Sequence, residues 1–235
     1  MARAGRLIER LSACLALAAA LVLASCGGGT VETAPAKRQQ KKEATLVRTP
    51  LFSADSAYAF VERQVAFGNR VPNSAGHRKC GDYLIGQLEA FGAAVTVQEA
   101  RVKAYDGTNL DIRNIFGAFN PREKRRILLY AHWDTRPYAD KDSVRTKEPI
   151  DGANDGASGV GVLLELARIM SDSLPKVGVD IAFFDAEDYG EPEWLPNRDS
   201  DYTDWCLGSQ YWARKPHIPG YRAKYGILLD MVGAK

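Results

Sequence analysis

The chain has 235 residues, of which 46% are apolar and 26% are charged, and its formal net charge is +2. This length allows one domain with a sizeable core, and the composition is ordinary for a soluble globular protein. The nearly neutral charge gives no support for a polyanionic partner, so we expect no binding to nucleic acid.

The first 26 residues differ from the rest of the chain. Residues 1–10 are basic, and residues 11–23 form an apolar stretch that is too short for a comfortable membrane span. Leu23-Ala24-Ser25-Cys26 then resembles the lipobox of bacterial lipoproteins, in which the cysteine is lipidated and becomes the new N-terminus. An ordinary cleaved signal peptide is the alternative. We therefore expect an exported lipoprotein, periplasmic or at the outer membrane, that is anchored to the membrane through Cys26.

Residues 27–50 predict a flexible tether, and residues 51–235 are the expected folded domain. This domain contains Cys80 and Cys206. An exported protein can join such a pair by a disulfide bond, but the helical pattern around Cys80 does not fix its distance from Cys206. The sequence leaves both the bonded and the free state open.

Two helices are expected at the start of the domain, from 53 to 67 and from 75 to 91. Ser53 and Ser74 are suitable N-terminal caps, and Gly92 ends the second helix. Strands are expected at 95–103, 110–119, 126–131, 179–184 and 225–229. Two more helices are expected at 155–170 and 204–214. The first two strands are typical of an antiparallel pair, whereas the later apolar runs are typical of buried central strands.

This order of elements predicts an α/β fold, a three-layer sandwich with a central mixed, mostly parallel sheet flanked by helices. The chain stops directly after a strand, where an α/β domain would normally add a covering helix. We therefore expect that the C-terminal part of the domain is missing.

Four short acidic segments lie at the ends of predicted strands or at the start of a helix. They are His132-Trp133-Asp134, Gly152-Ala153-Asn154-Asp155-Gly156, Asp185-Ala186-Glu187-Asp188 and Leu229-Asp230. In an open α/β sheet such ends point into one crevice, where ligands bind. A histidine and several carboxylates in that crevice indicate a zinc site with a general base beside it.

Asp155 and the pair Glu187–Asp188 are the strongest candidates. Asp155 begins a predicted helix and could simply cap it, but a cap does not need glycines on both sides. Adjacent carboxylates repel one another, so a cation that relieves the repulsion would explain why Glu187 and Asp188 stand together. One of them could bind the metal while the other stays free as the base. An exposed acidic loop is the alternative.

His132, Asp134 and Asp230 are weaker candidates when each is taken singly. The i, i+2 spacing of His132 and Asp134 places both side chains on one face of an extended chain. A carboxylate beside a metal-bound histidine typically orients its ring. A structural role is the alternative for His132, and Asp230 could cap a turn.

Five segments together resemble the zinc exopeptidase superfamily, which contains dinuclear zinc aminopeptidases and glutaminyl cyclases. They are most similar to the bacterial glutaminyl cyclases of the Bacteroidetes type, and the resemblance runs from about Phe52 to Lys235. The segments are Phe67-Gly68-Asn69-Arg70-Val71-Pro72, His132-Trp133-Asp134-Thr135-Arg136-Pro137, Gly152-Ala153-Asn154-Asp155-Gly156-Ala157-Ser158-Gly159, Phe184-Asp185-Ala186-Glu187-Asp188 and Leu228-Leu229-Asp230-Met231-Val232-Gly233.

The resemblance implies one zinc ion, with Asp155 and Asp188 as ligands and a histidine beyond residue 235 as the third ligand. Glu187 would be the general base and acid, and Asp230 would position the reacting amine. His217 lies before the last strand and is not expected to replace the third ligand. A chain of this length is therefore expected to hold zinc weakly or not at all.

The resemblance also implies that Trp194 forms an aromatic wall of the substrate pocket, in keeping with a loop that leaves the catalytic turn directly. Covering the edge of the core is the alternative for Trp194. Trp205 and Trp212 are expected on a helix, as packing residues.

The implied reaction is cyclisation of the N-terminal glutamine of a peptide or protein to pyroglutamate, with release of ammonia. A dinuclear zinc aminopeptidase is the alternative: His132 and Asp230 would hold a second zinc ion, Asp155 would bridge the two ions, and Glu187 would activate water. A third hypothesis is an inactive, lipid-anchored binding module on the same scaffold. The intact base and carboxylate ligands disfavour this third hypothesis.

Overall fold

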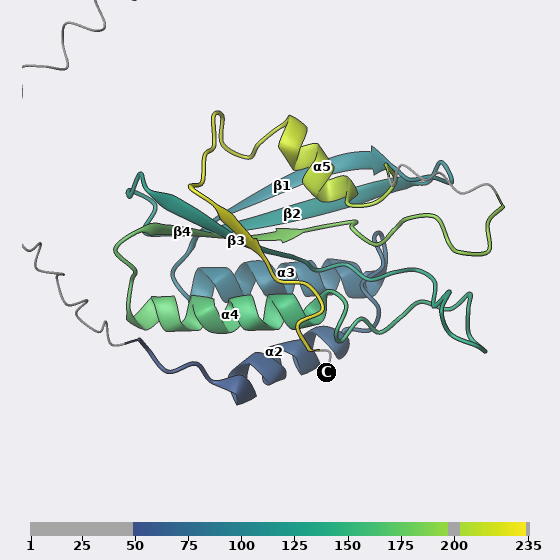
Figure 1. Ribbon diagram of the computed structural model, residues 1–235, viewed down its shortest axis with the longest axis horizontal. Coiled ribbons are helices and arrows are strands. Elements are labelled where there is room, and N and C mark those ends of the chain that lie inside the picture. Colours follow the sequence, from purple (N-terminus) through teal and green to yellow (C-terminus); the bar gives the residue numbers. More distant parts are fainter. Residues whose placement is uncertain (1–48, 197–202, 234–235) are drawn as a thin grey trace, which may run out of the picture. The chain divides into compact units, whose positions relative to one another are not determined.

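Five strands form one sheet in the part of the chain that the computed structural model describes, residues 49–196 and 203–233 (Figure 1). The strands are β1 (Ala94–Lys103), β2 (Asn109–Phe119), β3 (Arg126–His132), β4 (Gly178–Phe184) and β5 (Gly226–Leu228). The predicted signal peptide, the lipobox with Cys26 and nearly all of the predicted tether lie outside the described residues.

The sheet is mixed, as predicted, and its strand order is β1-β2-β4-β3-β5. The pairs β1–β2 and β2–β4 are antiparallel, whereas β3 pairs in parallel with β4 and with β5. Because β3, β4 and β5 run in the same direction, their carboxyl ends meet at one edge of the sheet. The predicted acidic segments follow these three ends.

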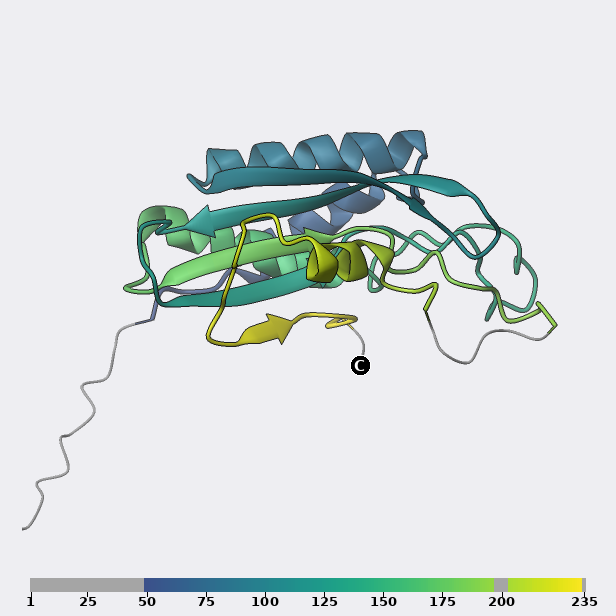
Figure 2. The same cartoon turned by 90° about the horizontal axis from the view of Figure 1, so that it is seen from above.

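Helices cover both faces of this sheet, which confirms the predicted three-layer sandwich (Figures 1 and 2). The helices are α2 (Ala54–Val65), α3 (Ala75–Ala90), α4 (Ala157–Asp172) and α5 (Leu207–Arg214). Helices α3 and α4 pack on one face and α5 on the other, while α2 packs on the outside of α4. Ser53 and Ser74 cap α2 and α3 as predicted, because each hydroxyl accepts a hydrogen bond of 3.1 Å from a main-chain N–H of the first turn.

The larger apolar core lies between the sheet and helices α3 and α4. Its fully buried side chains include Leu84, Leu88, Val160, Leu163, Leu164, Ile181 and Phe183. A smaller cluster around Phe116 and Phe184 lies on the α5 side, and Trp212 packs against both rings. The prediction that Trp212 is a packing residue is therefore confirmed.

Two helices begin later than predicted, and in both cases a residue with positive φ precedes the helix. Helix α4 begins at Ala157 because Gly156, at φ +89°, occupies the cap position. Asp155 therefore does not cap the helix, so the structural alternative for this residue is wrong. Helix α5 begins at Leu207, after Cys206 at φ +56°. Trp205, predicted on this helix, lies in the turn before it.

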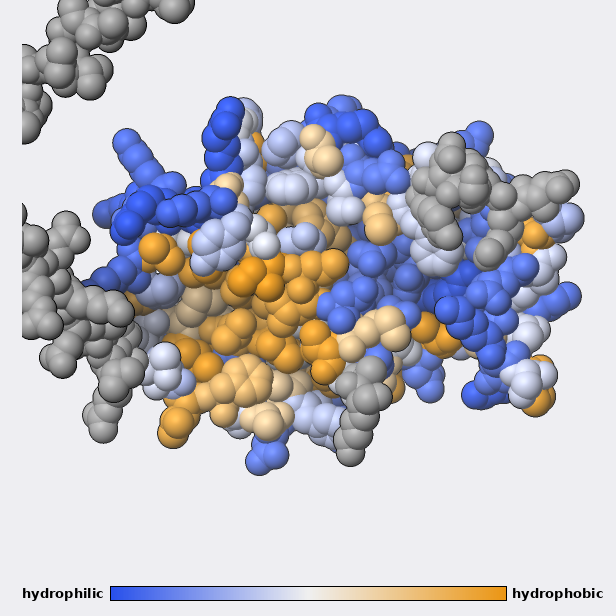
Figure 3. Space-filling view, viewed as in Figure 1, coloured by the Kyte–Doolittle hydropathy of each residue, from blue (hydrophilic) through white to orange (hydrophobic). Residues whose placement is uncertain are grey.

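Strand β5 is exposed along its whole length, and Figure 3 shows apolar side chains gathered around it and α4. Tyr225, Ile227 and Leu228 are each about half exposed. Hydrophilic residues gather instead around the loops that follow the strands (Figure 3). Within the described part of the chain, no helix is both long and apolar enough to cross a membrane.

Candidate functional site

The carboxyl ends of β3 and β4 bring the first two candidate segments together. His132 is the last residue of β3 and lies opposite Phe184, the last residue of β4. The Trp133 N–H extends the pairing by one hydrogen bond of 3.0 Å to the Phe184 carbonyl. The acidic turn Asp185–Asp188 therefore begins beside His132.

His132, Asp155 and Asp188 each offer one ligand atom to a common point, and these atoms lie within 4.8 Å of one another. His132 Nε2 is 3.0 Å from Asp155 Oδ1 and 3.6 Å from Asp230 Oδ1. The strand order thus brings Asp155 and Asp188 together, as the sequence leads one to expect. His132, considered only for a second zinc ion, belongs to the same group.

Several atoms of this group are buried without a hydrogen bond of proper geometry to any described residue. They are His132 Nδ1 and Nε2 and Asp188 Oδ2. Buried polar atoms are nearly always satisfied, so three orphans in one cluster call for a missing partner. A divalent cation between His132 Nε2 and Asp188 Oδ2 satisfies two of them, while His132 Nδ1 lies 3.5 Å from the Asp134 carboxylate on the other side of the ring. Imidazole with carboxylates is a donor set that suits zinc. The residues present therefore fit a zinc ion.

The protonation of the cluster reflects its burial and its excess of acidic groups. Burial, together with nearby Asp134 and Asp155, raises the pKa of Asp188 to about 8. Burial and the neighbouring carboxylates also raise the pKa of Glu187 to about 7. Burial would lower the pKa of His132, but the carboxylates of Asp134, Asp155 and Asp230 beside its ring raise it well above its ordinary value. The metal-free cluster therefore retains protons that a bound cation would displace.

Asp134 holds the acidic turn in place beside His132. Its carboxylate accepts hydrogen bonds from the N–H groups of Glu187 and Asp188, at 3.0 and 3.1 Å. Its Oδ1 also lies 3.5 Å from His132 Nδ1. Ala186, at φ +51°, makes the tight turn that presents both N–H groups to one carboxylate. Asp134 thus fixes the histidine and the turn with a single side chain.

Asp230 is placed by the first turn of α4. The Val232 N–H donates to Ser158 Oγ at 3.1 Å, and the Gly233 N–H donates to Asn154 Oδ1 at 2.9 Å. Gly159 allows the approach, because a Cβ there would lie 2.1 Å from the carbonyl oxygen of Leu229. The same turn that carries Asp155 therefore holds the segment that carries Asp230.

A cavity of about 590 Å³ opens beside Asp155 and Asp188. Its other lining residues include Arg136, Tyr138, Asp140, Lys141, Glu193 and Trp205. A volume of this size is typical of small-ligand pockets, which span roughly 300–1,000 Å³. The cavity is therefore large enough to accept part of a peptide next to the metal ligands.

Trp205 is a wall of this cavity and lies before the helix, so its predicted place on the helix is wrong, although its ring does pack against its neighbours. The guanidinium of Arg136 lies 4.6 Å from its ring centre, and a Cβ on Gly190 would lie 2.0 Å from the indole. The ring is thus held between a cation and a glycine. No local signal in the sequence identifies this role, because the turn depends on the left-handed conformation of Cys206.

Arg136 connects this wall to the metal ligands. Its Nη1 donates to the main-chain carbonyls of Asp188 and Gly190, at 3.1 and 3.4 Å, and its guanidinium is paired with Asp140. In the sequence, Arg136 stands out only as part of the segment that begins at His132. The two carbonyls that it binds belong to residues more than fifty positions away in the chain.

Trp194 packs against a residue that lines the cavity. Its ring packs edge to face on Tyr138, with ring centres 5.1 Å apart, and its side chain is 41% exposed. The Tyr138 side chain lines the cavity. The structure therefore brings Trp194 close to the site, and its contact with substrate stays a prediction.

Two other sequence candidates do not join the site. His217 Nδ1 accepts a hydrogen bond of 2.9 Å from Trp212, and its ring stacks on Phe116 with ring centres 3.8 Å apart. As expected, it does not take the place of a metal ligand. Cys80 and Cys206 are both free thiols, and Cys80 is fully buried. The open question of their disulfide is therefore resolved in favour of the free state.

Comparison with solved structures places this fold and site among known enzymes. The chain is 57% identical to a glutaminyl cyclase from Bacteroides thetaiotaomicron bound to N-acetylhistamine, with a TM-score of 0.77, covering 79% of this chain and 64% of that one. It is equally identical to a leucine aminopeptidase precursor from the same organism, with a TM-score of 0.77, covering 80% of this chain and 65% of that one.

Sequence comparison gives the family. A glutaminyl-peptide cyclotransferase from Bos taurus is 33% identical over 138 residues, which are 52% of this chain and 36% of that protein. The chain thus spans less than half the length of the curated relatives that it matches. The sequence model of peptidase family M28 matches residues 114–235, the half of the chain that carries every candidate ligand. The chain belongs to peptidase family M28.

Proposed function

We propose that this chain forms the zinc-binding catalytic part of a glutaminyl-peptide cyclotransferase, which acts on the N-terminal glutamine of peptides or proteins. The observation that carries this proposal is the cluster of metal-binding side chains His132, Asp155 and Asp188, with the half-buried Glu187 directly beside Asp188 in the acidic turn. The glutaminyl cyclases among its relatives support the proposal.

The proposed reaction is an intramolecular acyl transfer. The α-amine nitrogen attacks the side-chain amide carbon, a C–N bond forms, and the bond to the amide nitrogen breaks to release ammonia. Glu187 takes a proton from the attacking amine and gives it to the departing nitrogen, so the residue ends as it began. A carboxyl with a pKa close to the working pH is well suited to both transfers.

Zinc, when held by Asp155, Asp188 and a further ligand, would supply a Lewis acid that polarises the amide carbonyl. Asp230 would hold the α-amine beside this group. Trp194 and Trp205 would close the cavity around the glutamine side chain and exclude water. The cyclisation depends on this exclusion, because water that enters would compete with the amine.

A dinuclear aminopeptidase is the second candidate, and one observation favours it. His132 and Asp230 are 3.6 Å apart and could hold another zinc ion together with Asp155. In that case Glu187 would take a proton from water rather than from an amine. The relative described as a leucine aminopeptidase precursor supports this reading.

Substrate assays and metal content of the full-length protein separate the two functions. For the cyclase we expect one tightly bound zinc ion per chain, ammonia release from glutaminyl peptides and no cleavage of leucine anilide. The rate should rise with pH through about 7.7–8.0, the range in which an α-amine becomes neutral. Two zinc ions with anilide cleavage would establish the aminopeptidase, and a rate independent of pH would contradict attack by the amine.

We also propose that the protein is exported and anchored to the membrane by lipid on Cys26. The support is the sequence Leu23-Ala24-Ser25-Cys26 after a short apolar segment. Replacing Cys26 with Ala should move the protein from the membrane fraction to the soluble fraction, while Cys14→Ala, within the predicted leader, should leave it in place. A Cys26→Ala protein that remains in the membrane fraction would contradict the anchor.

A further inference from the structure

Arg70 is a fully buried arginine near the site, with no exposed surface. It lies in the connection between α2 and α3 and directs three donors at main-chain carbonyls. Nε donates to Trp133 at 3.1 Å, Nη1 to Asp151 at 2.8 Å and Nη2 to Gly152 at 2.7 Å. The planar guanidinium therefore joins two loops.

These two loops are the ones that carry the metal-binding side chains. Trp133 follows His132 directly, and Gly152 lies three residues before Asp155. The main chain of Arg70 strengthens the link: its N–H donates to Thr135 Oγ1 at 2.8 Å, and its carbonyl accepts from the Thr135 N–H at 3.3 Å.

The guanidinium of Arg70 is tightly packed against the turn at Gly152. Gly152, at φ +63°, has no room for a side chain, because a Cβ there would lie 2.2 Å from Thr135 Cγ2 and 2.7 Å from Arg70 Nη2. The spacing between the β3 end and the turn of Asp155 is therefore set by the shape of the Arg70 side chain.

The charge of Arg70 is also unusual, because no ion pair of the described residues includes it. Burying an unpaired charge is costly. Burial lowers the pKa of Arg70, whereas the fields of Cys80, Asp134, Asp151 and Asp155 raise it. The cation thus faces the carboxylate cluster without contacting it.

We propose that Arg70 is a positioning residue for the metal centre. Its guanidinium fixes the distance between His132 and Asp155, and its charge offsets the repulsion among the carboxylates before a metal binds. This inference rests on the zinc site of the proposed function, but it holds equally for a cyclase and for an aminopeptidase.

The test replaces Arg70 with Lys and with Met in the full-length protein and measures zinc affinity by competition with a chromophoric chelator. Lysine keeps the charge but loses the planar fork that reaches both loops. Loss of a residue that orients metal ligands typically weakens metal binding by about 10–100-fold. We expect the zinc Kd to rise about tenfold for Arg70→Lys and about a hundredfold for Arg70→Met.

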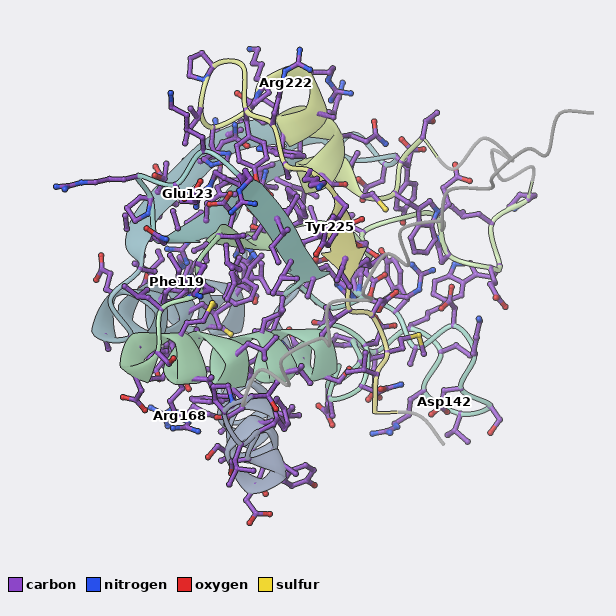
Figure 4. The ribbon with its side chains drawn as sticks, turned by 60° about the vertical axis from the view of Figure 1, so that its left-hand side comes forward. Phe119, Glu123, Asp142, Arg168, Arg222 and Tyr225 are labelled. Carbon is purple, nitrogen blue, oxygen red and sulfur yellow. The ribbon has the colours of Figure 1, made fainter. Side chains whose placement is uncertain are left out.

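Arg126 is a matched control. It is the first residue of β3, whereas Arg70 binds the main chain just after the last residue of β3. It too donates to three main-chain carbonyls, those of Asn120, Glu123 and Phe119, at 3.0–3.2 Å. Figure 4 shows Phe119 and Glu123 at the end of the sheet opposite Asp142, which lies in the loops beyond β3. Substitution of Arg126 should therefore lower the melting temperature without changing the zinc Kd.

The two arginines separate positioning from general destabilisation. Arg70→Lys that binds zinc within threefold of the wild type would overturn the proposal, and so would an Arg126→Lys variant that loses zinc affinity to the same extent. Arg70→Lys is the decisive variant if Arg70→Met does not fold. A wild-type protein without zinc affinity would instead overturn the metal site itself, which distinguishes failure of the proposed function from failure of this inference.

Discussion

Replacing Glu187 with Gln should reduce cyclisation by about 10²–10⁴-fold, the usual contribution of a general acid–base group. Glutamine keeps the shape of the side chain but cannot take a proton from the amine. Asp155 and Asp188 are unchanged, so the variant should bind zinc as the wild type does. Burial raises the pKa of Glu187 to about 7, so a neutral amide at this position is expected to leave the fold intact.

Ammonia release from a glutaminyl peptide measures the loss, with zinc content and circular dichroism recorded on the same samples. Glu148→Gln is a suitable control, because Glu148 is exposed and lies in a loop after β3. This control should retain full activity. A Glu187→Gln enzyme within a few-fold of the wild type would remove Glu187 from the mechanism, whichever substrate is used.

The convergence of the acidic segments was predictable because it depends on local patterns and on one topological rule. The apolar runs before His132 and Asp185 identify buried strands, and the carboxyl ends of parallel strands meet at one edge. The structure places His132 opposite Phe184 in register. Ser53 and Ser74 were recognisable as caps for the same reason, since a cap acts within one turn of its helix.

The roles of Trp205, Arg136 and Arg70 could not be predicted in this way. Trp205 has helical spacing with Trp212, and only the left-handed Cys206 removes it from the helix. Arg136 and Arg70 bond to carbonyls far away in the chain, and arginine is ordinarily an exposed residue. Interactions of this kind depend on the completed fold, so neither residue type nor spacing predicts them.

Asp188 is also expected to make the stability of the metal-free protein depend on pH. Burial, more than its acidic neighbours, raises its pKa from an ordinary 3.8 to about 8. The folded metal-free protein therefore binds a proton here more tightly than the unfolded chain does. Stability falls with rising pH wherever the folded state holds more protons, so the loss extends from about pH 4 to about pH 8.

Asp188→Asn should remove this loss, because the amide is never ionised. A tenfold change in an equilibrium constant corresponds to about 1.4 kcal/mol, so the metal-free variant should exceed the wild type by on the order of several kcal/mol at pH 8. The difference should vanish near pH 4, where the wild-type carboxyl is protonated as well. Zinc should reverse the order, since it stabilises only a protein that binds it.

Urea unfolding at pH 4 and pH 8, with a chelator and then with zinc, measures the free energy of unfolding of both proteins under each of these four conditions. Asp172→Asn, at the exposed end of α4, is the control and should follow the wild type throughout. Because the pKa of Glu187 is also raised, the free energy of unfolding of the Asp188→Asn variant should still fall with rising pH, but less steeply than that of the wild type. A variant that is less stable than the wild type at pH 8 without metal would show that Asp188 is held by ordinary structural contacts. A more stable variant that no longer responds to zinc would show that this carboxylate is kept at a cost to the fold because the metal requires it.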